Sequence, residues 1–83
     1  MATLDQTLQI FRALLDAEQP VAIGEADAAI WAYLSSIPGL SAQVEALVVL
    51  RAKTVELNSA SDFLPSLLDD LDLHRARLSE KSV

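Results

Sequence analysis

The sequence predicts an all-α fold: a small up-and-down bundle of four helices at about residues 4–17, 25–36, 42–58 and 62–79. Apolar residues recur at helical spacing in each of these four segments. Proline and glycine separate the first three segments, and every connection is short. Short connections favour antiparallel neighbours, which is why we expect the up-and-down arrangement within a single domain of residues 1–83.

The first expected helix has a clear start and one apolar face. Thr3 and Gln6 have the spacing of a capping box, in which each side chain bonds the backbone of the other residue. The apolar residues then recur at i+4, i+3 and i+4, and they are Leu4, Leu8, Phe11 and Leu15.

The second expected helix is bounded by acidic residues at its start and by a turn at its end. Glu25 and Asp27 lie in the first turn, where a carboxylate is favoured by the helix dipole. Pro38 and Gly39 form a stop and a turn.

The third expected helix, with Ser41 as its N-cap, organises the fold. Its middle, residues 46–50, is apolar almost all the way round. A helix on the surface shows one apolar stripe, whereas a helix that is apolar on several sides is covered from several sides. We therefore expect the other three segments to pack around it.

The fourth expected helix begins near Ser61 and Asp62, and Pro65 is acceptable there because first-turn N–H groups lack helical partners. Residues 64–68 match the LxxLL pattern of groove-binding helical peptides. The same spacing is required of any buried helix face, so we interpret these leucines as core. Residues 79–83 are expected to fray.

Charge is distributed unevenly along the chain. The formal net charge is −6, and residues 1–50 hold six acidic side chains and one basic one, against six acidic and five basic in residues 51–83. Binding to phosphates needs clustered Lys and Arg, so nucleic acid is a poor partner. The acidic half either favours a partner protein with a basic surface or serves solubility alone.

The remaining composition excludes several classes of protein. The chain has no cysteine, so disulfides and thiolate metal sites are excluded. No apolar run approaches the ~20 residues that span a bilayer. The first residues lack the basic start and long apolar run of a signal peptide, so a cytoplasmic location is expected.

The apolar content is the most informative feature of the composition. Hydrophobic residues make up 52% of the 83 residues. A domain of this size buries only about 60% of the surface of its unfolded chain. Some apolar side chains should therefore remain exposed on a monomer and mark an interface, either with another protein or with a second copy as a homodimer.

Catalytic chemistry is hard to assemble from these residues. With one histidine and no cysteine, a Cys–His pair or a multi-histidine metal site cannot form within one chain, and we expect no enzymatic activity and no cofactor. His74 is expected to be a solvated helical histidine that can pair with Asp70 four residues before it. Asp69, Asp70 and Asp72 are expected to be a solvated charge run, since the glycine turn of a calcium loop is missing.

Five residues are candidates for binding a partner: Asp27, Trp31, Val49, Arg51 and Leu73. Arg51 interrupts an apolar arc, where it either extends along the bundle to water or pairs with a carboxylate across the bundle or a dimer interface. Trp31 either packs at the core edge or anchors an interface beside Asp27. Leu73 and Val49 point away from the expected core and are candidates for an exposed apolar patch.

These features predict a small acidic protein-binding module, such as an adaptor, chaperone or inhibitor, that acts through an apolar patch with an acidic rim. The alternative is an acidic antagonist that occupies a nucleic-acid-binding site on a partner protein, as phage inhibitors and antitoxins do. That alternative requires carboxylates spaced along one exposed ridge.

Overall fold

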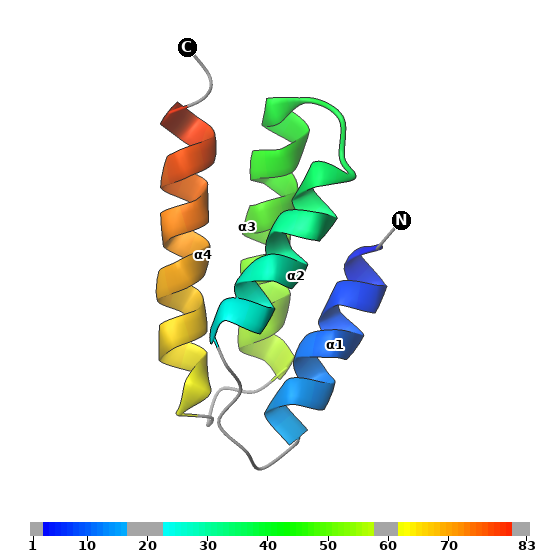
Figure 1. Cartoon of the computed structure of the whole chain (residues 1–83), viewed down its shortest axis with the longest axis vertical. Helices are drawn as coiled ribbons and strands as arrows, with labels where there is room; N and C mark the ends of the chain where they lie inside the picture. The colour runs from blue at the N-terminus through cyan, green and yellow to red at the C-terminus, as the bar shows by residue number, and fades with distance from the viewer. Residues whose placement is uncertain (1–2, 17–22, 58–61, 81–83) are drawn as a thin grey trace.

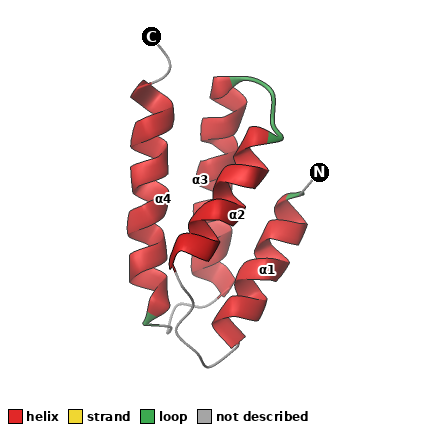
Figure 2. Cartoon of the chain, in the orientation of Figure 1, coloured by secondary structure: helices red, strands yellow, loops and turns green. Residues whose placement is uncertain are grey.

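The structure is a computed structural model that describes residues 3–16, 23–57 and 62–80. These residues form four helices and no strand, as Figure 2 shows. The helices are α1 (Leu4–Asp16), α2 (Ile23–Ser35), α3 (Leu40–Leu57) and α4 (Phe63–Glu80). Successive helices run in opposite directions in Figure 1, so the predicted up-and-down four-helix bundle is confirmed.

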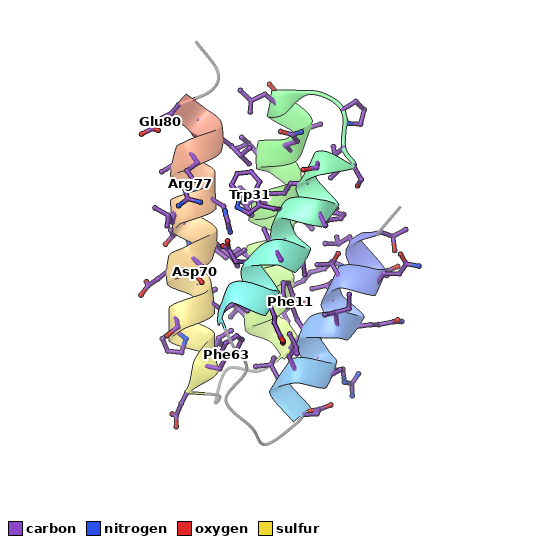
Figure 3. All side chains as sticks on the ribbon, viewed as in Figure 1. Phe11, Trp31, Phe63, Asp70, Arg77 and Glu80 are labelled. Carbon is purple, nitrogen blue, oxygen red and sulfur yellow. The ribbon has the colours of Figure 1, made fainter. Side chains whose placement is uncertain are left out.

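Helix α3 is the centre of this bundle. It packs against each of the other three helices, whereas α1 and α4 lie at opposite edges in Figure 1. The core forms where the inner faces of the four helices meet. Phe11 projects from α1 towards this core and is fully buried (Figure 3). The other large apolar side chains buried to the same degree are Ile30, Leu34, Leu47, Leu50, Leu67, Leu71 and Leu78.

The start of α1 is a capping box, as predicted. The Thr3 N–H donates to Oε1 of Gln6 at 3.0 Å, and the Gln6 N–H donates to Oγ1 of Thr3 at 3.1 Å. This exchange satisfies N–H groups that have no partner inside the helix. Leu8 and Phe11 are buried behind it, which gives α1 the apolar face that its spacing predicts.

The turn between α2 and α3 corrects the expected start of the third helix. Ser41 is not the N-cap, because α3 begins at Leu40 and the Gln43 N–H already donates to the carbonyl of Gly39 at 3.1 Å. Gly39 has a φ of 91°, a left-handed conformation that side chains disfavour. The Gln43 side chain also donates to the carbonyl of Ile37 at 2.9 Å and braces the turn.

Helix α4 begins at Phe63, so Pro65 lies in its first turn as expected. Leu64 and Leu67 are buried and Leu68 is partly buried, which confirms the core interpretation of the LxxLL pattern.

Helix α1 begins at Leu4, as predicted, and the remaining boundaries within the described residues differ from prediction by one or two residues. Helix α2 begins at Ile23 and ends at Ser35, and Ser79 and Glu80 belong to α4. The expected ends of the first and third helices, at residues 17 and 58, and the tail at 81–83 lie outside the described residues.

Candidate protein-binding surface

The outer side of α3 is an exposed apolar ridge. Leu47 and Leu50 on one flank are buried, but Val48, Val49 and Val55 are 46%, 40% and 42% exposed. The expectation that α3 is covered on several sides is therefore only partly right. Three neighbouring helices all lie against one half of α3, and a four-helix bundle has no further helix to cover its valines.

A small hollow lies beside this ridge, between α3 and α4. Its volume is about 60 Å³, and its lining residues are Leu47, Val48, Arg51, Leu71, Asp72 and Arg75. The hollow is therefore small, with room for a few water molecules or one short side chain. Val48 thus belongs both to the exposed ridge and to the wall of the hollow.

Arg51 lines the hollow and pairs with Asp72 of α4. Its Nη1 lies 3.0 Å from Oδ1 of Asp72, and both side chains are about half exposed, at 45% and 51%. Arg51 was expected either to extend along the bundle to water or to pair with a carboxylate. The structure has the pair, and it joins α3 to α4 across the bundle. A pair this exposed to solvent contributes only about 0–1 kcal/mol to stability, so it orients the two side chains more than it stabilises the fold.

Val49 and Leu73 are both exposed, as predicted, but on different helices. Leu73 is the most exposed large hydrophobic residue described, at 50%, and it lies on the outer side of α4. Neither residue lines the hollow between α3 and α4, where Val48 takes that position. The two residues therefore mark two apolar surfaces, one on each helix.

Trp31 and Asp27 of α2 meet a residue that the sequence interpretation misjudged. His74 was expected to be solvated, but its side chain is fully buried. Oδ1 of Asp27 lies 2.5 Å from Nε2 of His74, and the Trp31 and His74 rings pack edge to face with centroids 4.6 Å apart. Trp31 is partly buried in this contact, which matches its core-edge alternative (Figure 3).

The contact between Asp27 and His74 is close but not ideally directed. The carboxylate oxygen does not lie along the direction of a hydrogen bond from Nε2, and Nδ1 of His74 is buried with no hydrogen-bond partner among the described residues. At 2.5 Å, the carboxylate of Asp27 is nevertheless in direct contact with the imidazole. This polar link joins α2 to α4 inside an otherwise apolar interface.

The buried position of His74 has a signal in the sequence. His74 lies three residues after Leu71 and four before Leu78, so it continues the inner leucine stripe of α4. The prediction of a solvated side chain was based on the polarity of histidine, whereas the spacing of His74 from the buried leucines indicated a buried one.

The charge run of α4 is divided among three environments. Asp69 is exposed, Asp72 pairs with Arg51, and Asp70 is partly buried, with Oδ2 lacking a hydrogen-bond partner among the described residues. The expectation of a solvated run is therefore right for Asp69 and for Asp72, which stays half exposed in its ion pair, and wrong for Asp70.

Neither a metal-binding cluster nor a membrane-spanning helix is found among the described residues. Within residues 3–16, 23–57 and 62–80, no group of three or more His, Asp or Glu side chains is arranged to hold a metal ion. None of the described helices is long and apolar enough to cross a membrane.

The structure brings Asp27 and Trp31 together around His74, sets Arg51 in the hollow between α3 and α4, and leaves Val49 and Leu73 on separate outer faces.

No protein-family model, curated protein or solved structure matches the chain.

Proposed function

We propose that this is a small cytoplasmic protein-binding module, of the adaptor, chaperone or inhibitor kind, that acts by contact and catalyses no reaction. The observation that carries the proposal is the exposed ridge of Val48, Val49 and Val55 on the central helix α3. Val48 and Val55 lie two turns apart on one stripe of the helix, and Val49 lies beside Val48, so the three side chains form one exposed apolar area. Exposed apolar areas of this kind mark interaction surfaces. Burial of this area by a partner would supply most of the affinity.

The ridge has acidic residues at both ends. Glu45, Val49, Ala52 and Glu56 follow one another at i, i+4, i+7 and i+11, so they share one side of α3, and all four are exposed. Glu45 therefore lies about one turn before Val49, and Glu56 lies about one turn after Ala52 and directly after Val55. This arrangement fits the expected apolar patch with an acidic rim.

The chemistry of the partner follows from this pattern. A helix or flat surface with an apolar centre and Lys or Arg at its margins would bury the valines and face the carboxylates. The net charge of −6 would speed encounter with such a basic surface and slow encounter with acidic ones. Exposed Arg51 and Lys53 lie between the two glutamates, so the middle of the surface is not itself acidic.

The proposal is tested by capture of partners from the native cell with wild-type protein and two variants, followed by mass spectrometry and by calorimetry on the purified partner. Val49→Asp places a charge in the ridge, and Ile10→Asp is the matched control, because Ile10 is 46% exposed on a different helix, α1. Far-UV circular dichroism checks that each variant keeps the fold.

We expect Val49→Asp to weaken binding at least about tenfold, since it buries a charge without a partner in the complex, and Ile10→Asp to bind like wild type. Equal binding by wild-type protein and Val49→Asp would reject the ridge as the binding surface.

The alternative function, an acidic antagonist of a nucleic-acid-binding protein, finds less support in the geometry. Asp16 lies 3.9 Å from the guanidinium of Arg12, and Asp27 is engaged with His74. Glu18 lies outside the described residues. Two of the carboxylates that this alternative requires therefore already have a partner within the chain, whereas Asp5 and Glu25 are exposed.

A further inference from the structure

The outer face of α4 carries a second, independent arrangement of apolar and charged residues. Leu73 lies near the middle of the helix and is 50% exposed. Asp69 lies four residues before it and Arg77 four residues after it, so both flank Leu73 on the same outer side. Each lies about 6 Å from Leu73 along the helix axis. Both are exposed, and within the described residues neither forms an ion pair.

This face is complementary to itself when two copies of α4 run antiparallel. Rotation by 180° about an axis through Leu73 exchanges the positions of Asp69 and Arg77. Each aspartate of one copy then faces the arginine of the other, and the two Leu73 side chains meet at the axis. A two-fold interface requires one patch to be complementary to itself in this way.

Three further features of α4 suit the same arrangement. The helix lies at the edge of the bundle, and its outer side is not covered by another described helix (Figure 1). Ala76, one turn from Leu73, is exposed and small enough for two helices to approach closely. Antiparallel helices also place the positive end of one helix dipole beside the negative end of the other.

We infer that the α4 face formed by Asp69, Leu73, Ala76 and Arg77 is a homodimer interface, with a second copy of this chain bound antiparallel across Leu73. One exposed helix face is small beside a typical stable interface, so the dimer should be weak and should form at high micromolar concentration. The inference rests on the proposed function in one respect, because both take exposed apolar side chains to be binding surfaces. It uses α4 alone and leaves the α3 ridge free for the other partner.

The test is sedimentation velocity across micromolar to millimolar protein concentration, with charge-exchange variants. Asp69→Arg alone and Arg77→Asp alone each place like charges opposite one another in a dimer of identical copies, and we expect each to weaken association about tenfold. An equimolar mixture of the two single variants restores two opposite-charge pairs, and so does the double variant. We expect both to dimerise like wild type.

Salt titration is a poorer test than charge exchange. Each copy carries a charge of −6, so added salt screens the repulsion between copies while it also weakens the ion pairs. Leu73→Asp should abolish association, and Ile10→Asp, which changes an equally apolar site on α1, should leave it unchanged.

Disulfide cross-linking provides a second test of the same dimer geometry. The chain has no cysteine, so Leu73→Cys introduces a single thiol close to the proposed axis. Mild oxidation should convert this variant to a disulfide-linked dimer much faster than Ile10→Cys, because a disulfide requires Cα atoms within about 7 Å.

The inference is overturned if wild-type protein stays monomeric up to millimolar concentration, or if it associates but the mixture of single variants does not regain association. Either result would leave the α3 ridge untouched. Loss of partner binding in Val49→Asp, measured separately, would then still support the proposed function.

Discussion

Asp27 of α2 and His74 of α4 are 2.5 Å apart, between Oδ1 and Nε2, although they belong to helices that are distant in the sequence. The imidazole is fully buried and Trp31 packs edge-on against it, so a polar contact lies inside an apolar interface. Buried polar groups are costly when they lose a partner, and for this reason the contact should couple the two helices.

Removal of the carboxylate should destabilise the protein. We expect Asp27→Ala to lower the free energy of unfolding by about 1–3 kcal/mol, because His74 is left buried without its electrostatic neighbour. Urea unfolding followed by far-UV circular dichroism measures the effect. In a His74→Leu background the same substitution should cost less than about 0.5 kcal/mol, since no polar group remains to be orphaned. An equal cost in both backgrounds would show that the two residues are not coupled.

The two glycines should respond to alanine in opposite directions. Gly39 has a φ of 91°, so Gly39→Ala should destabilise the protein by about 1–2 kcal/mol. Gly24 is helical, and a Cβ at that position meets no atom within 4 Å. Gly24→Ala should therefore stabilise the protein by about 0.4–1 kcal/mol through the lower entropy of the unfolded chain. Thermal unfolding of the two variants provides the comparison, and a shift of the same sign in both would contradict it.

The capping box of α1 should be energetically significant. Thr3→Ala removes the oxygen that accepts from the Gln6 N–H, and we expect a loss of about 1 kcal/mol in the free energy of unfolding. Thr3→Ser keeps that oxygen, and because Ser is at least as good an N-cap as Thr, the free energy of unfolding should stay close to that of wild type. Chemical denaturation distinguishes the two, and similar losses in both variants would indicate that the methyl group, not the hydroxyl, matters.

Tyr33 should make stability depend on pH in the alkaline range. Burial raises the pKa of its phenol above the ordinary value of 10.0, since desolvation disfavours the phenolate. The folded state then keeps the proton to a higher pH than the unfolded state does. The stabilisation is fully present below the unfolded pKa and is lost as pH rises through the folded pKa.

This behaviour is open to direct measurement because Tyr33 is the only tyrosine. Phenolate absorbance, titrated in native protein and in urea, should show the native transition at higher pH. Coincident transitions would mean that burial leaves the phenol as accessible to hydroxide as in the unfolded chain. A Tyr33→Phe variant should lose this part of the pH dependence of stability.

Several features of the fold were determined within short stretches of sequence. The capping box depends on Thr3 and Gln6, three residues apart, and the turn before α3 depends on the conformational freedom of Gly39. The core leucines of α4 follow from their spacing alone. The start of α3 was wrong by two residues because the Gly39 carbonyl, not the Ser41 side chain, begins the helix.

The partners of charged and polar side chains depended on tertiary structure. Arg51 had two open alternatives, and only the rotation of α4 against α3 brings Asp72 within 3.0 Å of it. His74 was expected in solvent, and only the packing of α2 on α4 encloses it between Asp27 and Trp31.

The sequence by itself therefore determined the four helices and the apolar residues that each turns towards the core, because helix formation and amphipathic spacing depend on residues within one or two turns. Tertiary structure alone decided which side of the central helix remains open. Val48, Val49 and Val55 are as apolar as the leucines beside them, and they stay exposed because the three neighbouring helices all pack against the other side of α3.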